Sequence, residues 1–218
     1  MYTLPIHSKV LVTGGAGFIG SNLAEYLINQ GAYVRVLDNF STGKPDNINY
    51  LLSHSNFELF EGDICNLDHC QRACQDINYV MHQAALGSVP ASIEDPLATH
   101  KVNVTGTLNM LLASKDSKVK RFIYASSSAV YGDDPTLPKK EGTEGKLLSP
   151  YATSKLICEY YAQIFTTVYN LETIGLRYFN VFGNRQDPNS IYAAVIPIFV
   201  QNLLNNDAPT IHGDGEQS

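Results

Sequence analysis

The sequence lacks the features that mark a membrane protein or a nucleic-acid-binding protein. No apolar run approaches the ~20 residues that span a bilayer. The first residues, Met1 to Ile6, do not combine a cationic stretch with an apolar one as a secretory leader does. Basic residues are in deficit, with 15 Lys and Arg against 21 Asp and Glu and a net charge of −6. We therefore expect a cytoplasmic protein that binds neither nucleic acid nor a membrane.

Patterns for metal binding and disulfide bonding are also missing. The cysteines, Cys65, Cys70, Cys74 and Cys158, form no C-x-x-C pair, and the six histidines show no H-x-x-x-H spacing. We expect reduced thiols and no metal site, with zinc binding by the cysteines as the alternative.

The sequence does contain a regular alternation of apolar strands and helices. Its 44% hydrophobic content excludes a disordered chain, and 218 residues allow one large domain or two small ones. Runs rich in β-branched and aromatic residues predict strands at 9–13, 33–37, 56–60, 79–81, 121–125 and 173–177. Apolar residues at helical spacing predict helices at 18–30, 66–74, 95–114, 149–169 and 192–205. This order predicts an α/β fold, a doubly wound parallel sheet with helices on both faces.

The first predicted strand runs into a glycine-rich turn with the spacing G-x-x-G-x-x-G. Gly14 permits the tight turn, Gly17 lets a pyrophosphate approach the backbone, and Gly20 lets the next helix pack close to the strand. The start of that helix, at Phe18 and Ile19, presents free N–H groups to phosphate. Because the turn follows a strand and opens a helix, it predicts a Rossmann-type dinucleotide site.

Acidic and small residues follow the next strands, where a dinucleotide would lie. Asp38 stands 18 positions after Gly20. A carboxylate there accepts hydrogen bonds from both ribose hydroxyls and repels a 2′-phosphate, which favours NAD over NADP. Asp63, after the third strand, is placed to reach the adenine amino group, and an ordinary turn aspartate is an equal alternative. The remaining predicted cofactor residues at these strand ends are Asn39, Ile64, Gln83, Ala84 and Ala85.

A tyrosine and a lysine four positions apart, Tyr151 and Lys155, share one face of a predicted helix. An ammonium beside a phenol favours the phenolate and lowers its pKa from ~10, so that the phenol can act as a general base near neutral pH. Ser126 to Ser128 lie at the carboxyl end of the fifth strand, where ligands of doubly wound sheets bind. A serine there can relay a hydroxyl proton to Tyr151.

Together, the glycine turn, the segment 126–132 and the Tyr151/Lys155 pair resemble the extended short-chain dehydrogenases/reductases that act on nucleotide sugars. The resemblance runs over essentially the whole chain. Segments 82–90 and 177–183 are similar to UDP-sugar 4-epimerases. Segments 185–189 and 192–197 look most like the UDP-N-acetylglucosamine 4-epimerase branch used in surface-polysaccharide synthesis.

The resemblance implies roles for individual residues. Ser127 matches the catalytic serine, Tyr151 the base, and Lys155 the lysine that binds the nicotinamide ribose and tunes the tyrosine. Asn103 and Tyr178 match positions on the cofactor side. The positions that contact the UDP-sugar are matched by Gly87, Ser88, Ser127, Ser128, Tyr151, Asn180, Ala194 and Val195. For the last two, helix packing is the alternative.

The resemblance implies an NAD-dependent isomerase that epimerises carbon 4 of a UDP-hexose through a transient 4-keto sugar. The implied substrates are UDP-N-acetylglucosamine and UDP-N-acetylgalactosamine, or the corresponding uronic acids. The alternatives are a UDP-glucose 4-epimerase, a decarboxylase, a dehydratase and a non-catalytic NAD-binding protein. The 4,6-dehydratases carry an Asp-Glu pair where this chain has Ser128 and Ala129, which counts against dehydration.

The resemblance also implies a homodimer and a division into domains. The helices near 102–112 and 151–165 would pair in the dimer, although their apolar faces equally suit packing on the sheet. Residues 1–180 form the expected NAD-binding domain, and 181–218 the first part of a smaller substrate-binding lobe. In the family, more chain follows and completes that lobe. We therefore expect the 218 residues alone to bind NAD but to turn over little substrate.

Overall fold

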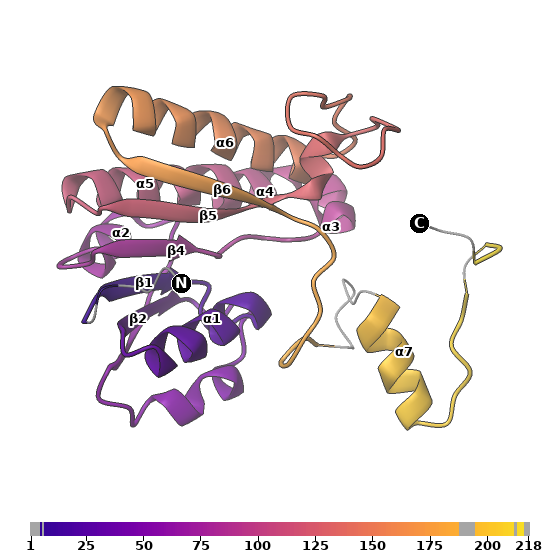
Figure 1. The fold of residues 1–218 in the computed structure, drawn as a ribbon, viewed down its shortest axis with the longest axis horizontal. Coiled ribbons are helices and arrows are strands. Elements are labelled where there is room, and N and C mark those ends of the chain that lie inside the picture. The colour runs from indigo at the N-terminus through magenta and orange to yellow at the C-terminus, as the bar shows by residue number, and fades with distance from the viewer. Residues whose placement is uncertain (1–4, 6, 188–194, 212, 216–218) are drawn as a thin grey trace.

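The computed structural model describes residue 5 and residues 7–187, 195–211 and 213–215, and a parallel sheet forms its centre. Six strands lie in the order β3-β2-β1-β4-β5-β6 (Figure 1). Their bounds are β1 Lys9–Thr13, β2 Tyr33–Asp38, β3 Phe57–Glu61, β4 Tyr79–His82, β5 Arg121–Ser127 and β6 Glu172–Tyr178. The predicted doubly wound parallel sheet is confirmed, and each predicted strand is present with small shifts at its ends.

Helices cover both faces of the sheet. Helix α1 Phe18–Asn29 and two 3₁₀ turns, Pro45–Asn47 and Asn49–Leu51, pack on one face. The other face carries α2 Leu67–Ala73, α5 Gly106–Asp116 and α6 Pro150–Tyr169 (Figure 1). Between β4 and α5 lie α3 Val89–Glu94, α4 Pro96–Thr99 and a π-helical turn, His100–Thr105. None of the helices in these ranges is both long and apolar enough to cross a membrane.

Strand β1 explains why the strands are apolar at successive positions. Val10, Leu11 and Val12 are all fully buried. Leu11 packs in the core beneath α5 and α6, whereas Val10 and Val12 pack beneath α1. Because successive side chains point to opposite faces of a strand, a sheet covered on both faces needs apolar residues at every position.

The strand order places a crevice at the middle of the sheet. From β1, the chain adds β2 and β3 on one side and then β4, β5 and β6 on the other. The connections that leave β1 and β4 therefore part in opposite directions at the carboxyl ends of these strands. Doubly wound sheets bind their ligands at such a point.

The helices before β5 depart from the prediction. The helix expected over 95–114 is divided into α4, the π-helical turn and α5, and the sequence reading missed α3. Side-chain caps mark the starts of α3 and α4, whereas the π-helical turn and α5 begin without a side-chain cap, on helical backbone that continues from α4. The side chain of Ser88 accepts a hydrogen bond from the Ala91 N–H at 3.0 Å, and that of Asp95 accepts one from the Ala98 N–H at 2.9 Å. A new helix begins after each.

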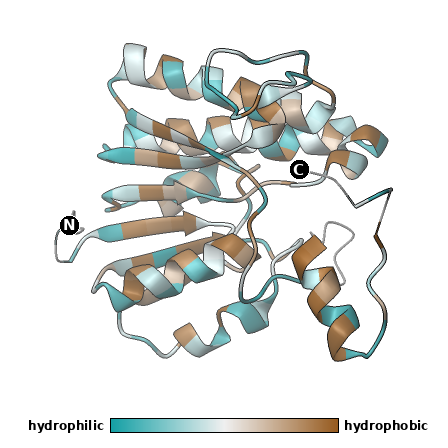
Figure 2. Ribbon diagram, turned by 45° about the vertical axis from the view of Figure 1, so that its right-hand side comes forward, coloured by the Kyte–Doolittle hydropathy of each residue, from teal (hydrophilic) through white to brown (hydrophobic). Residues whose placement is uncertain are grey.

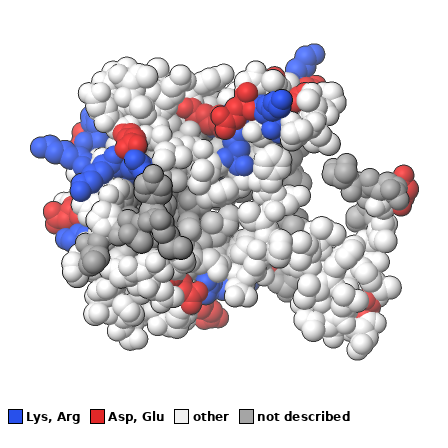
Figure 3. Space-filling view, in the orientation of Figure 1, with Lys and Arg blue, Asp and Glu red and all other residues white. Residues whose placement is uncertain are grey.

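Helix α7, Val195–Leu204, stands away from the sheet (Figure 1). It has no charged residue (Figure 3), and its exposed side chains are largely apolar (Figure 2), Leu203 and Leu204 among them. The helix predicted over 192–205 is confirmed for the part that the structure describes, and its first residues lie outside the described ranges. The domain boundary between residues 180 and 181 stays a prediction.

Candidate active site

The glycine turn sits where β1 meets α1, and it leaves no room for side chains. Gly14 has φ of +66°, and a Cβ there would lie 2.8 Å from the backbone of Ala84. A Cβ on Gly20 would lie 2.1 Å from the carbonyl oxygen of Gly14. Gly17 is the N-cap of α1, so the first free N–H groups of the helix face the end of the turn. The turn is therefore shaped to bring backbone N–H groups close to an anion.

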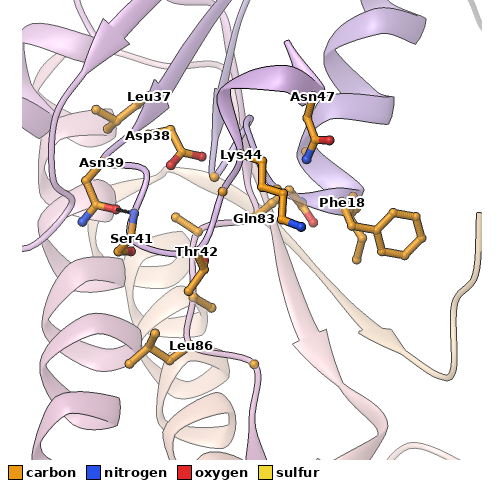
Figure 4. A pocket seen from close by; sticks show the side chains of 18 of the residues that line it. Phe18, Leu37, Asp38, Asn39, Ser41, Thr42, Lys44, Asn47, Gln83 and Leu86 are labelled. Carbon is orange, nitrogen blue, oxygen red and sulfur yellow. Dashed lines mark hydrogen bonds between the residues drawn. The ribbon is translucent and has the colours of Figure 1, made fainter. Parts of the chain in front are cut away.

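A cleft of about 390 Å³ opens in front of this turn. In the view of Figure 4, Asp38, Ser41 and Thr42 lie along one side and Lys44 and Phe18 along the other. The predicted cofactor residues that line the cleft are Gly14, Gly17, Phe18, Ile19, Gly20, Asp38, Asn39, Asp63, Ile64, Gln83, Ala84 and Ala85. The structure thus brings together residues from the ends of four strands.

Asp38 is buried at the end of β2 and holds two backbone segments. Its Oδ2 accepts the N–H of Ala16 in the glycine turn, and its Oδ1 accepts the N–H of Phe40, both at 2.8 Å. Each carboxylate oxygen keeps a second lone pair. Asp38 can therefore order the turn and still accept a ribose hydroxyl, as the sequence predicted.

Asp63 and Asn39 also fix the backbone around the cleft. Asp63 Oδ1 accepts the Cys65 N–H at 2.7 Å. Burial raises the pKa of Asp63, but hydrogen bonds, those from Cys65 foremost, outweigh burial and leave the pKa below its usual value. Asn39 Oδ1 accepts the Ser41 N–H at 3.0 Å. Asp63 is thus a carboxylate at neutral pH, able to accept a hydrogen bond from an amino group.

The side chain of Gln83 provides a test of whether a dinucleotide fits. Among the described residues, its buried amide nitrogen and oxygen have no partner at hydrogen-bond geometry, although an interaction with Gln83 lowers the pKa of the Tyr178 hydroxyl in part. Buried polar atoms in folded proteins are nearly always paired, so this amide calls for a ligand that supplies a donor and an acceptor. Together with the glycine turn and Asp38, it fits a bound dinucleotide.

The predicted catalytic residues meet beside the end of β5. Ser127 is the last residue of β5, and Tyr151 and Lys155 lie in the first half of α6, whose N-cap is Ser149. Lys155 is only 6% exposed. Its Nζ donates to the Ala125 carbonyl at 2.9 Å and lies 5.8 Å from the centre of the Tyr151 ring.

The acid–base properties of this group differ from the prediction. Burial raises the pKa of Tyr151, and a hydrogen bond with Ser127 lowers it only in part. The expectation that Lys155 leaves Tyr151 with a lowered pKa is therefore wrong for the chain on its own. The ammonium is directed to the Ala125 carbonyl, and burial lowers the pKa of Lys155 itself. The interaction with Ser127 still supports a proton path between the two hydroxyls.

Contacts with a cluster of charged residues distinguish Ser126 from the neighbouring Ser127. Ser126 donates to Glu159 Oε1 at 2.5 Å, and Arg177 forms a bidentate pair with the same carboxylate at 2.9 and 2.8 Å. Arg177 also donates to Glu144 at 2.5 Å. The hydroxyl of Ser126 is thereby engaged with α6, which leaves Ser127 as the serine beside Tyr151.

The other predicted residues fall into two groups. Asn103 is buried, and its amide binds both backbone groups of Leu86 and the hydroxyl of Ser154, so it holds the loop after β4 against α6. Tyr178 ends β6, and burial raises its pKa. Gly87 lines the cleft, and Ser88 is buried as the cap of α3. Of the remaining predicted sugar contacts, Ser128 opens a 3₁₀ turn after Ser127, Asn180 and Val195 are exposed, and Ala194 lies outside the described residues.

Sequence reasoning missed two walls of the cleft. One is the loop after β2, which lines the cleft with Ser41, Thr42, Gly43, Lys44 and Asn47. Its small polar residues directly after a predicted strand were an available signal. The other wall is formed by Arg185, Gln186 and Asp187. No local pattern marks these residues as neighbours of the glycine turn.

Comparison with known proteins gives a consistent result. The model of the family described as NAD dependent epimerase/dehydratase matches residues 10–218. The UDP-N-acetylglucosamine 4-epimerase of Methanobrevibacter ruminantium M1, solved in complex with UDP-N-acetylmuramic acid, is 44% identical with a TM-score of 0.92. The alignment covers 98% of this chain and 68% of that one.

Two further relatives act on other sugars. The UDP-glucuronic acid 4-epimerase of Bacillus cereus, crystallised with UDP-glucuronic acid and NAD, is 35% identical with a TM-score of 0.85, over 96% of this chain and 67% of its own. The UDP-glucose 4-epimerase of Mycolicibacterium smegmatis is 34% identical over 96% of this chain and 67% of its own length. The chain thus spans about two thirds of the length of these relatives.

Proposed function

Because the chain belongs to the NAD dependent epimerase/dehydratase family, we propose that its protein is a UDP-hexose 4-epimerase whose substrate is UDP-N-acetylglucosamine or its galacto epimer. The family's cofactor is the one that Asp38 and the glycine turn predicted. The observation that carries the proposal is the hydrogen bond between Ser127 and Tyr151, with Lys155 5.8 Å from the Tyr151 ring, in a chain whose other strand ends form the dinucleotide cleft. The N-acetylated sugar is favoured by the relative that is 44% identical and by the segments 185–189 and 192–197.

In the proposed reaction, Ser127 and Tyr151 transfer the proton of the sugar's 4-hydroxyl. Bound NAD supplies a hydride acceptor and donor for carbon 4 of the sugar. Tyr151, as phenolate, accepts the proton of the 4-hydroxyl through Ser127 and returns it after the sugar has turned over, so no proton is gained or lost overall. Burial raises the pKa of Tyr151 and the hydrogen bond with Ser127 lowers it in part, so Ser127 is the group of this chain that favours the phenolate.

The rest of the site restrains the intermediate. Binding energy from the UDP moiety, remote from carbon 4, keeps the 4-keto sugar in place while it turns. Elimination of water is disfavoured because Ser128 and Ala129, which follow Ser127, supply neither a carboxylic acid nor a carboxylate. Epimerisation needs no further acid or base beyond Ser127 and Tyr151.

The direct test is product analysis on the full-length, NAD-loaded protein. We expect UDP-N-acetylglucosamine to be converted into its galacto epimer, observed by NMR. UDP-glucose and UDP-glucuronic acid should be converted more slowly in parallel samples. Faster conversion of UDP-glucose would favour the UDP-glucose 4-epimerase alternative. A protein that holds NAD but converts none of the three sugars would contradict the proposed function.

We also propose that the protein is a homodimer. On α6, Tyr160, Ile164 and Val168 follow one another at four-residue spacing and are 59%, 50% and 61% exposed. Such a stripe of apolar residues along a helix is typical of an interface. Sedimentation of the purified protein should give twice the mass of one chain, and Ile164→Glu should reduce it to one chain.

A further inference from the structure

The segment 183–187, called the strap below, follows β6 in one half of the fold and packs against α1 and the loop after β2 in the other half. Figure 1 shows the chain running from the end of β6 past the carboxyl edge of the sheet toward α1 before α7 begins. The last three residues of the strap line the same cleft as the glycine turn. A molecule bound on the glycine turn and filling the cleft would therefore also lie against the strap.

Arg185 fixes the strap to the opposite half of the fold. Its Nη2 donates to Asn22 Oδ1 and to Glu25 Oε2 on α1, both at 2.8 Å. Its Nη1 donates to the hydroxyl of Tyr50 at 2.8 Å, and the guanidinium lies 5.8 Å from the centre of that ring. The Arg185 side chain is 18% exposed and that of Glu25 is 40% exposed, so solvent screens this charge-assisted pair only in part.

Further contacts extend this attachment along the strap. Asn22 also donates to the Asn184 carbonyl at 2.9 Å. At the far end, Lys44 Nζ and Asp187 Oδ2 are 2.6 Å apart, with 59% and 31% of their side chains exposed. The Lys44 pair is exposed and contributes little on its own. Arg185 is therefore the main attachment.

The backbone of Arg185 is in a conformation that its side-chain contacts help to impose. Its φ is +67°, in the left-handed region that a side chain disfavours. Non-glycine residues hold such a conformation when surrounding contacts impose it, and such residues cluster at ligand clamps. Without its partners on α1 and Tyr50, the strap would relax from this conformation.

We propose that the strap is a retaining bar for the bound dinucleotide, and that Arg185 is the positioning residue that holds it closed. The proposal rests on NAD as the cofactor of the proposed function. An epimerase returns the hydride to the same sugar, so it gains from keeping its cofactor through many turnovers. Both Nη groups of Arg185 bind α1 and Tyr50, and only Nε has no partner among the described residues, so in this proposal Arg185 retains the dinucleotide chiefly by holding the strap.

This role has a kinetic signature that direct binding does not share. Loosening a bar over a cleft speeds both entry and exit of the ligand, and the dissociation constant changes little. Loss of a direct phosphate contact would instead speed exit and slow entry, because the arginine would no longer attract the anion. Asn22 and Glu25 do not line the cleft. Substituting them should change the NAD exchange rates as Arg185→Ala does only if Arg185 acts by holding the strap.

The test measures NAD exchange in the whole protein for wild type, Arg185→Ala, Glu25→Gln and Asn22→Ala. Protein preloaded with NAD is chased with a fluorescent etheno-adenine analogue, and association is followed by mixing the analogue with cofactor-free protein. We expect release to be ~10-fold or more faster in Arg185→Ala, with association also faster. Glu25→Gln and Asn22→Ala should follow in the same direction.

Arg121→Ala is the matched control, because it breaks another Arg–Glu pair, with Glu172, at the opposite edge of the sheet. Its exchange rates should equal those of wild type. Circular dichroism of each variant checks that it folds. Bound NAD with unchanged release in all three strap variants would overturn the strap alone. Slower association in Arg185→Ala would overturn it in favour of a direct contact. A wild-type protein that binds no dinucleotide would overturn both the strap and the proposed function.

Discussion

The two halves of the sheet contribute different chemical groups to the candidate site. At the ends of β1 and β2, the cleft is formed mainly by backbone, through the glycine turn and the segments that Asp38 holds. At the end of β5, the predicted chemistry depends instead on titratable side chains, Tyr151 and Lys155 of α6, which do not themselves line the cleft. A site formed by backbone requires that no side-chain atoms fill the turn. A site formed by titratable side chains requires that burial and nearby charges give these groups suitable pKa values. The two halves should therefore fail in different ways when they are mutated.

The largest effect is expected in the side-chain half, from Tyr151→Phe. The ring stays and the hydroxyl is lost, so the cleft is unchanged but the proton has no acceptor. We expect turnover by the full-length protein to fall ~10³-fold, within the range for loss of a general base, with the amount of bound NAD unchanged. Turnover is read by NMR and NAD by absorbance after acid release.

Tyr161→Phe is the matched control, because Tyr161 lies on the same helix and is partly exposed. It should retain wild-type turnover. Equal turnover by Tyr151→Phe and wild type would remove Tyr151 from the proposed mechanism.

The backbone half should respond to a single added methyl group, in Gly20→Ala. The new Cβ would lie 2.1 Å from the Gly14 carbonyl, so the turn or the start of α1 must shift. We expect a loss of ~1–3 kcal/mol in the free energy of unfolding, the usual range for overpacking, together with weaker NAD binding. Urea denaturation and NAD titration measure the two effects.

Gly87→Ala serves as the control for stability, since a Cβ there meets nothing within 4 Å. Its free energy of unfolding should match that of wild type. If Gly20→Ala were equally stable and bound NAD as tightly, the close packing of the turn would have no functional role.

Removing the Arg177 ion pairs, which link β6 to α6, should cause a comparable loss of stability without changing the glycine turn. Arg177→Met leaves Glu159 and Glu144 without their partner, and the side chains of this cluster are only 15–25% exposed. We expect a loss of ~2–3 kcal/mol, at the lower end for breaking a buried pair because solvent screens part of it. Arg121→Met breaks an exposed pair and should cost under ~1 kcal/mol in the same urea titration. Equal losses in both variants would contradict the structural role of the cluster.

The halves also differ in how far the sequence predicted them. The strands, the glycine turn and the helix that begins after Ser149 were found because each depends on residues a few positions apart. A short apolar run rich in β-branched and aromatic residues predicts a buried strand, and glycine spacing between a strand and a helix predicts a tight turn. Asp38 could be placed because it ends a strand that lies beside β1 in this topology.

Groups that depend on distant parts of the chain were not found. The pKa of Tyr151 is set by burial, which the spacing to Lys155 does not report. Ser126 and Glu159 are 33 positions apart, and Arg185 and Glu25 are 160 apart. Nothing local in the sequence pairs these residues, because packing of the sheet and helices brings them together.

His82 joins the two halves, and it supplies the smallest expected effect. It ends β4, where its Nδ1 lies 2.7 Å from the Thr13 hydroxyl on β1 and its Nε2 lies 3.0 Å from the Thr107 hydroxyl on α5. Burial, with help from the nearby charge of Lys155, lowers its pKa to about 3. The folded protein therefore holds His82 neutral at pH values where an unfolded histidine takes up a proton.

The sign of the pH dependence follows from this difference. Because the folded pKa lies below the unfolded value of ~6.5, His82 contributes its full stability above that value and loses it as the pH falls toward 3. Between pH 7 and pH 5 the loss is ~2 kcal/mol in the free energy of unfolding. His82→Gln cannot take up the proton, so its own loss over this interval, measured by urea denaturation, should be smaller by that amount. NMR titration of the wild-type imidazole gives the same information without mutation. If the His82 ring took up a proton near pH 6 in the folded protein, water or charge would reach the region between the two halves of the sheet. The contrast between the backbone half and the buried side-chain half would then be weaker than the hydrogen bonds of His82 indicate.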